Sequence, residues 1–327
     1  MKQIVLRGPG EFMAREASVP VLSPGEAIVR IRKVGVCGSD FHAFAGRHPV
    51  YTYPRILGHE LAGEVVEVDV NDFGICVGDR CAIEPYISCG ECKPCKAGRT
   101  NCCEQLRVLG IHVDGGMQGL LSVPLSLLHK SEQLSLDELA LIETLGIGAH
   151  AVSRSRITRG QSALVVGAGP IGLAVAEFAK ATGAEVRIVE KSHWRKNFAI
   201  SLGMKALAEF DGNLADVVFD ATGSAESMSE SLSYVAPTGR LVFVGLTKDP
   251  VTLDDSLLHR REVTIFASRN SYGQFPRIIR MLEERQINMR PWITDRMQLA
   301  QVPTEFKDLS SRPTLIKAIV DVEEAEG

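Results

Sequence analysis

Cysteine is the residue whose spacing says most about chemistry in this chain. Five of the eight cysteines lie within one short stretch, as Cys89, Cys92, Cys95, Cys102 and Cys103. Thiolates on tight turns can converge on one ion, and four of them close a tetrahedral zinc site with no open position. The bacterial ferredoxin run continues x3-C-P, which this stretch does not. The cluster therefore predicts a structural metal site, with a cysteine-rich loop that binds nothing as the alternative.

A glycine-rich turn between two predicted strands is the second pattern. Residues 162–166 form a short apolar strand that leads into Gly167-Ala-Gly169-Pro170-Ile171-Gly172, a helical stretch at 173–182 and a second strand at 185–189. This is the strand, G-x-G-x-x-G, helix, strand order of a dinucleotide-binding unit, in which the backbone approaches the pyrophosphate closely and the helix N-terminus faces it. We expect a nicotinamide cofactor here; a glycine turn in a cofactor-free α/β domain is the alternative.

The acid that follows the second strand bears on which cofactor is used. Glu190 stands where a carboxylate accepts hydrogen bonds from the ribose hydroxyls of the adenosine and repels a 2′-phosphate. The sequence therefore favours NAD over NADP. Lys191 and Arg195 are near enough in the sequence to soften that preference.

Three further stretches, residues 35–42, 57–60 and 140–146, carry residues that could bind metal or move protons. Each stretch alone is weak evidence for a site, because a single His or Cys is more often a packing residue than a ligand. The residues they supply are Cys37, Ser39, Asp40, His42, His59, Glu60 and Glu143.

Together, these stretches resemble the zinc-dependent medium-chain dehydrogenase family over essentially the whole chain. The shared motifs, in the family's order, are G-V-C-G-S-D, L-G-H-E, the four-cysteine lobe, E-x-L-x-x-x-x-H, G-A-G-P-I-G and F-D-A-T-G-S. The resemblance implies a catalytic zinc on Cys37, His59 and Glu143, with Glu60 as a second-sphere or alternating ligand. It implies a structural zinc on Cys89, Cys92, Cys95 and Cys103. Cys76 and Cys81 match no ligand position, and we assign them to packing.

The resemblance also implies a reaction. Zinc lowers the pKa of an alcohol, whose carbon then passes hydride to the nicotinamide. Ser39 and His42 match the family's proton relay, while Asp40 is expected to orient a neighbouring ligand. The alternatives are an NAD(P)H-dependent aldehyde or ketone reductase, an L-threonine or simple alcohol dehydrogenase of the same fold, and a non-catalytic regulatory protein.

The substrate is indicated by fewer residues. Arg269 and Asn270 follow a predicted strand at the carboxyl edge of the sheet, where ligands of open α/β folds bind. Arg269 could pair with a substrate carboxylate, hold the cofactor or make a subunit contact. The S-R-N ending resembles a subgroup of sugar-acid dehydrogenases, so we expect a polyol or a sugar acid. His48, Tyr51 and Tyr53 could line the pocket mouth or form an ordinary surface loop.

Composition excludes several classes of function. The chain has 36 Lys and Arg against 40 Asp and Glu, a net charge of −4, so it lacks the basic surplus of a nucleic-acid-binding protein. The most apolar stretch, residues 172–181, contains Glu177 and Lys180, which excludes a transmembrane span. Arg7 interrupts the first apolar run too soon for a signal peptide, so we expect a cytoplasmic protein, in which clustered cysteines indicate metal before disulfides.

The elements that must position these residues predict an α/β protein of two domains. Alternating segments at 26–36 and 61–68 indicate an antiparallel β domain, and strands at 217–220, 240–244 and 264–267 extend a parallel, doubly wound sheet. The resemblance makes these a GroES-like catalytic domain (1–145 and 283–327, with a returning strand at 315–322) and a Rossmann NAD-binding domain (146–282). It also implies an active site in the cleft between them and a homodimer or homotetramer.

Overall fold

The computed structural model of the chain describes residues 1–48 and 50–322 and divides into two compact units. The first unit comprises Met1–Glu143 and Phe275–Gly327, and the second comprises Thr144–Gln274. The last five residues of the predicted segment 283–327 lie outside the described residues. Within the described part, no helix is long and apolar enough to cross a membrane.

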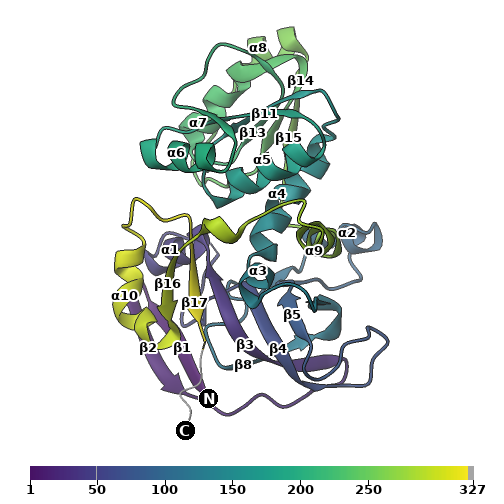
Figure 1. Cartoon of the computed structure of the whole chain (residues 1–327), viewed down its shortest axis with the longest axis vertical. Helices are drawn as coiled ribbons and strands as arrows, with labels where there is room; N and C mark the ends of the chain where they lie inside the picture. The colour runs from purple at the N-terminus through teal and green to yellow at the C-terminus, as the bar shows by residue number, and fades with distance from the viewer. Residues whose placement is uncertain (49, 323–327) are drawn as a thin grey trace. The chain divides into compact units, whose positions relative to one another are not determined.

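A β sheet forms the centre of the first unit (Figure 1). Its strands run in the order β16 (Ile293–Gln298), β17 (Lys317–Asp321), β3 (Glu26–Val36), β4 (Glu60–Val68), β5 (Arg80–Ile83) and β9 (Leu128–Lys130), and β8 (Leu120–Pro124) also pairs with β3. All pairs are antiparallel except β16 with β17. The strands predicted at 26–36, 61–68 and 315–322 are confirmed as β3, β4 and β17.

The order of this sheet brings together parts of the chain that are far apart in sequence. β17, near the end of the chain, pairs with β3, and β3 pairs with β4 on its other side. The core around them includes Val34, Leu61 and Phe306, all fully buried or nearly so. The carboxyl end of β3 is therefore flanked by two neighbours, and the residues that follow it start from a rigid position.

Smaller elements complete the first unit. They are β1 (Lys2–Gly8), β2 (Glu11–Glu16), α1 (Gly38–Phe44), β6 (Tyr86–Ile87), α2 (Lys93–Lys96), β7 (Arg107–Val108), α3 (Leu136–Ala140), α9 (Phe275–Glu283) and α10 (Val302–Leu309). Helix α9 joins this unit because the Phe275 ring lies 4.9 Å from that of His129 and Ser131 donates a hydrogen bond to Glu283. The domain boundary predicted after residue 282 falls inside this helix.

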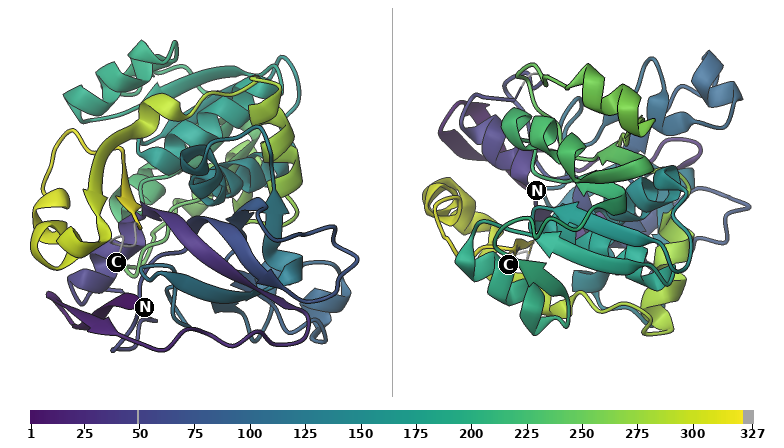
Figure 2. Two further views of the ribbon diagram at one scale, coloured as in Figure 1. Left: turned by 60° about the horizontal axis from the view of Figure 1, so that its bottom comes forward. Right: turned by 90° about the horizontal axis from the view of Figure 1, so that it is seen from above.

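The second unit is built on a six-stranded, fully parallel sheet (Figure 2). Its order is β12 (Lys205–Leu207), β11 (Glu185–Val189), β10 (Ser162–Val166), β13 (Ala215–Asp220), β14 (Val235–Phe243) and β15 (Thr264–Ala267). The connecting helices are α4 (Ile142–Ser155, which begins in the first unit), α5 (Pro170–Ala181), α6 (His193–Ser201), α7 (Ala225–Glu230) and α8 (Asp255–Arg261). The predicted doubly wound parallel sheet is confirmed.

The winding of this sheet reverses beside β10. The chain goes from β10 outward to β11 and β12, then returns to β13 on the other side of β10. In open α/β sheets ligands bind at the carboxyl ends of the strands at such a reversal. Helix α6 and the short strand β12 lie between β11 and β13, and α7 follows β13.

Candidate functional site

The carboxyl end of β3 positions the first group of predicted ligands. Cys37 follows β3 directly and begins α1, while His59 and Glu60 stand at the start of β4. Because Gly35 pairs with Glu60 in the β3–β4 register, these side chains come from adjacent strand ends. One potential ligand atom each of Cys37, His59 and Glu60 lies within 4.8 Å of the others. The structure thus brings together a thiol, an imidazole and a carboxylate.

Glu60 is held by a buried lysine that the sequence analysis did not single out. Glu60 is fully buried, and its Oε1 accepts a hydrogen bond from the Nζ of Lys317, which is 2% exposed and also donates to the Val36 carbonyl at 3.2 Å. Gly35 makes room for this carboxylate, because a Cβ there would lie 2.2 Å from Glu60 Oε2. A lysine within the apolar run Leu315-Ile-Lys-Ala-Ile-Val was the available signal.

Asp40 braces both Cys37 and His59 from the first turn of α1. Its Oδ2 accepts the Cys37 backbone N–H at 2.9 Å, and its Oδ1 lies 3.8 Å from His59 Nδ1. Burial raises the pKa of Asp40. Burial lowers the pKa of His59, but the charges of Asp40 and Cys37 outweigh it and hold that pKa well above its ordinary value. This geometry agrees with the orienting role expected for Asp40.

The two residues expected to relay protons lie on the same short helix. Ser39 Oγ is 3.5 Å from His59 Nε2, so its hydroxyl lies beside the group of potential ligands. His42 is one turn further along α1 and exposed to solvent. The pair therefore spans from the buried group to the surface, which a proton path requires; their role as a relay remains a prediction.

Glu143 is buried near this group but bonds elsewhere. It is 5% exposed, in the first turn of α4, and its Oε1 accepts a hydrogen bond from the Tyr86 hydroxyl. It is not among the three residues whose ligand atoms lie within 4.8 Å of one another. Burial raises the pKa of Glu143. The contact between Tyr86 and Glu143 could not be predicted from the sequence. The two residues are 57 positions apart, and no local pattern links them.

The chemistry of these side chains fits zinc. Thiolate sulfur, imidazole nitrogen and carboxylate oxygen are the donors that zinc takes in proteins. Among the described residues, Glu60 Oε2 is a buried oxygen without a hydrogen-bond partner. Buried polar atoms are normally paired, so an orphaned one within a set of metal donors indicates that a cation belongs there. Three protein ligands would leave a coordination position for a substrate.

The cysteine lobe forms a second group of metal donors. The sulfur atoms of Cys89, Cys92, Cys95 and Cys103 lie within 4.8 Å of one another. Backbone N–H groups point at them, from Cys92 to the sulfur of Cys89 at 3.4 Å and from Gln105 to that of Cys103 at 3.3 Å. Such N–H groups, chiefly that of Glu104, lower the pKa of Cys92 to about 7. The pKa of Cys103 is lowered in the same way, whereas burial raises the pKa of Cys95 to about 12. The convergence of four sulfurs fits a closed zinc site.

The remaining cysteines divide into two kinds. Cys81 is fully buried in β5, as expected for a packing residue. Cys76 is exposed, so its assignment to packing was wrong. The reason is that Cys76 lies in the loop between β4 and β5 rather than within a strand. Cys102 is exposed and lies outside the group of four sulfurs.

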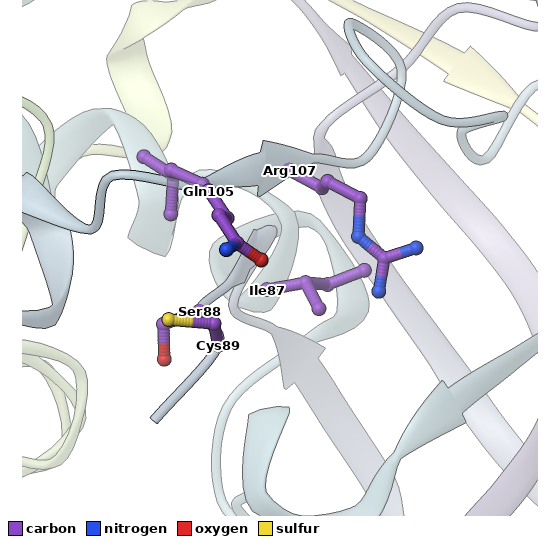
Figure 3. A pocket seen from close by; sticks show the side chains of 6 residues that line it. Ile87, Ser88, Cys89, Gln105 and Arg107 are labelled. Carbon is purple, nitrogen blue, oxygen red and sulfur yellow. The ribbon is translucent and has the colours of Figure 1, made fainter. Parts of the chain in front are cut away.

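A pocket of about 530 Å³ lies beside the cysteine lobe (Figure 3). Its lining residues are Ile87, Ser88, Cys89, Gln105, Leu106 and Arg107. Arg107 is its single ionisable group apart from the sulfur of Cys89, and Arg107 is exposed. The residues of the Cys37 group are absent from this lining, so the pocket belongs to the lobe.

The glycine-rich turn in the second unit has the geometry expected of a pyrophosphate site. Gly167 has a φ of +97°, which favours glycine, and Gly169 is the N-cap of α5, in which Pro170 and Ile171 are the first residues. A Cβ on Gly172 would lie 1.9 Å from the Gly167 carbonyl oxygen, so only glycine lets the helix start this close to the turn. The backbone N–H groups at the start of α5 are thus open to an anion.

Glu190 is tied into this turn by both carboxylate oxygens. Oε2 accepts the Ala168 N–H and Oε1 accepts the Ser192 N–H, each at 2.7 Å. A carboxylate has further lone pairs and can still accept ribose hydroxyls. Arg195 lies close to the turn, with Nη1 3.9 Å from the position of a Cβ on Gly169, whereas Lys191 is exposed.

Asp220 organises the neighbouring loop and was not singled out from the sequence. This fully buried residue ends β13 and accepts hydrogen bonds from the N–H and hydroxyl of Thr222 and from the hydroxyls of Ser227 and Ser231. The loop lies against the glycine-rich turn, since a Cβ on Gly167 would be 3.2 Å from Thr222 Cγ2. The hydroxyl-rich spacing after Asp220 was the available signal.

The two predicted substrate residues follow β15 in the second unit. Arg269 is exposed, and Asn270 adopts a left-handed backbone conformation with a φ of +51°. Their role toward a substrate stays a prediction.

Replacing Cys103 with serine should lower the zinc content by about one ion per chain, because a closed tetrahedral site needs all four sulfurs. The melting temperature should fall as well, since this metal holds the lobe together. Metal analysis and thermal unfolding measure both. Cys102→Ser is the matched control, because Cys102 is adjacent but exposed and outside the group. Equal zinc contents in the two variants would contradict the assignment.

Comparison with known proteins gives family matches to both units. Residues 23–133 match the alcohol dehydrogenase GroES-like domain, and residues 170–284 match the zinc-binding dehydrogenase model. L-galactonate-5-dehydrogenase of Escherichia coli K12 is 36% identical, with 98% of each chain covered.

Two solved structures have the same fold over nearly the full chain. A short chain alcohol dehydrogenase from Escherichia coli CFT073, in complex with NADH, gives a TM-score of 0.92 at 28% identity, covering 98% of this chain and 99% of that one. A protein provisionally described as a zinc-binding dehydrogenase, from Sinorhizobium meliloti 1021 and bound to NADP, gives 0.90 at 29% identity with the same coverage.

Proposed function

The chain belongs to the zinc-dependent medium-chain dehydrogenase/reductase family, and from this premise we propose that it oxidises a secondary alcohol of a polyol or sugar acid with NAD⁺. The observation that carries the proposal is the convergence of Cys37, His59 and Glu60 next to the Ser39 hydroxyl. We further propose one catalytic zinc held by Cys37, His59 and a carboxylate of Glu60 or Glu143, and one structural zinc in the cysteine lobe.

The proposed mechanism assigns binding and proton transfer to this chain's own residues. Bound zinc would supply the positive charge that lowers the pKa of the substrate hydroxyl, and bound NAD⁺ would supply the hydride acceptor. Ser39 Oγ is near enough to His59 to accept the proton of a hydroxyl held at this group while it releases its own hydroxyl proton toward His42. His42, exposed on the same helix, would take up that proton and pass it to solvent. Asp40 keeps Cys37 and His59 in place.

The preference for NAD⁺ rests on Glu190. Its position beside the glycine-rich turn allows it to accept ribose hydroxyls and to repel a 2′-phosphate, while Arg195 close by opposes that repulsion. One similar structure binds NADH and another binds NADP, so the cofactor preference of this chain has to be inferred from its own residues. Glu190 directly follows β11 and its carboxylate is bonded to the glycine-rich turn, which supports NAD⁺.

Glu190→Ala should raise the KM for NAD⁺ about tenfold, by loss of hydrogen bonds to a charged acceptor, and shift the NADP⁺/NAD⁺ ratio of kcat/KM toward NADP⁺ by a similar factor. Steady-state kinetics with both cofactors measures this. Glu185→Ala is the control, because Glu185 is an exposed residue at the start of the same strand. Because Glu190 also binds the backbone of the turn, a purely structural role would lower activity with both cofactors equally and leave the ratio unchanged.

The proposed substrate class rests on similarity. The chain is 36% identical to a protein named L-galactonate-5-dehydrogenase, over nearly its full length. Arg269 supplies a guanidinium at the carboxyl edge of the sheet that could pair with a substrate carboxylate. We therefore propose a sugar acid first and a neutral polyol second.

The experiment that tests this function is NAD⁺ reduction by zinc-loaded protein with sugar acids, neutral polyols, L-threonine and simple alcohols. Turnover of sugar acids that falls in Arg269→Ala supports the first choice, and Asn270→Ala serves as the neighbouring control. Turnover of neutral polyols alone keeps the dehydrogenase and removes the sugar acid. Turnover of L-threonine or simple alcohols alone, or reduction of aldehydes with NADPH alone, overturns the substrate proposal.

We also propose, on the family resemblance alone, that the protein forms a homodimer or homotetramer. Light scattering coupled to size-exclusion chromatography gives the mass directly. A monomer would overturn this proposal without affecting the chemistry.

A further inference from the structure

Tyr51 buries a hydroxyl close to the Cys37 group and leaves it without a partner. Tyr51 lies in the segment between α1 and β4 and is 8% exposed. Its hydroxyl oxygen is shielded from solvent, and among the described residues none forms a hydrogen bond with it. The sequence predicts that Tyr51 either lines the pocket mouth or belongs to an ordinary surface loop, and its burial favours the pocket.

The surroundings of this hydroxyl place it at the candidate catalytic site. Burial raises the pKa of Tyr51, and the charges of Asp40 and Cys37 raise it further, while the nearby Ser39 hydroxyl acts in the opposite direction. Those three residues lie at the start of α1, and one of them, Cys37, belongs to the group with His59 and Glu60. The Tyr51 hydroxyl is therefore a buried, unpartnered hydrogen-bond donor close to the start of α1.

The ring is held in this position by its own loop. The His48 ring meets it edge-on, with the centroids 4.5 Å apart and an interplanar angle of 79°. Two residues further on, the Tyr53 hydroxyl donates to the Ala43 carbonyl of α1, which fastens the loop to that helix. A donor that is buried, oriented and unpaired costs free energy unless something absent from the free protein accepts its hydrogen bond.

We propose that the Tyr51 hydroxyl donates a hydrogen bond to a second oxygen of the substrate, adjacent to the reacting carbinol, and so selects polyols and sugar acids over simple alcohols. The inference rests on the proposed function. Ser39 lies beside His59, where it would serve the reacting hydroxyl, and the Tyr51 hydroxyl is near Ser39, so it is available as a donor to a neighbouring substrate oxygen. A site built to bind a substrate hydroxyl discriminates strongly against an analogue that lacks it.

Two probes that differ by one hydroxyl test the proposal. Wild-type zinc-loaded protein should oxidise butane-2,3-diol with a higher kcat/KM than butan-2-ol. Tyr51→Phe should lower kcat/KM for the diol about tenfold or more and leave butan-2-ol within about twofold. Tyr53→Phe is the matched control, since it removes a hydroxyl from the same loop without removing the buried donor, and should change both probes by the same factor.

Other outcomes are informative about the proposal. If Tyr51→Phe lowers both probes equally, the hydroxyl serves the proton path or the loop, and the proposal is overturned. If it lowers neither, Tyr51 does not contact substrate. If wild-type protein reduces no NAD⁺ with any compound, the proposed function has failed. Calorimetry on zinc-loaded wild type and Tyr51→Phe then tests the Tyr51 proposal separately, by measuring how tightly each protein binds the two probes. Diol binding that is absent, or equally tight in both proteins, then overturns the proposal.

Discussion

Replacing Lys317 with methionine is expected to lower the free energy of unfolding by about 3–5 kcal/mol. Lys317 is 2% exposed and donates to Glu60, which is fully buried, so the substitution leaves a buried carboxylate without its cation. The carboxyl groups of Asp40 and Glu143 are also buried nearby, and the positive charge of Lys317 interacts with both of them. Methionine has a similar length, so the lost charge rather than a cavity dominates the effect. Urea unfolding of metal-free protein measures it.

The double variant Lys317→Met/Glu60→Gln is the control for this interpretation. Removing both charges should restore part of the lost stability, because no unpaired ion then remains buried. Zinc should have a parallel effect, since its charge beside Glu60 partly replaces that of the lysine. Lys317→Met should therefore destabilise zinc-loaded protein less than metal-free protein. Equal losses in both forms, with no recovery in the double variant, would show that packing around Lys317 matters more than its charge.

Local patterns explain why so much of the second unit could be predicted. The strands at 162–166, 185–189 and 264–267 form at the predicted residues. The glycines between the first two strands are required by contacts within the turn itself, such as that between Gly172 and the Gly167 carbonyl. Both partners lie a few residues apart, so the sequence motif contains the whole physical cause.

Long-range pairing explains what the sequence could not show around the candidate metal centre. Lys317 and Glu60 are 257 residues apart and meet only because β17 and β4 both flank β3. Tyr86 and Glu143 likewise meet through tertiary packing. The motifs indicated which side chains could bind metal, but their neighbours depend on strand order, which no local pattern in this chain encodes. The burial of the Tyr51 hydroxyl is of the same kind.

The loss of Cys37 is expected to have the largest effect on activity. Cys37→Ser should lower kcat/KM for the best substrate about a thousandfold, which corresponds to about 4 kcal/mol of transition-state stabilisation. The reason is that serine is a poor replacement for a thiolate ligand, so the metal held with His59 and Glu60 is lost or displaced. Steady-state kinetics and metal analysis together measure this.

Zinc content and stability separate this effect from unfolding. Cys37→Ser should retain about one zinc ion per chain, because the cysteine lobe is built from residues 89–103 and does not involve Cys37. Its melting temperature should stay closer to wild type than that of Cys103→Ser, since Cys37 is half-buried and follows β3 rather than supporting a lobe. Cys76→Ser, at an exposed position, controls for thiol removal as such. Full activity in Cys37→Ser would refute the catalytic assignment of the Cys37 group, even if the lobe still bound its metal.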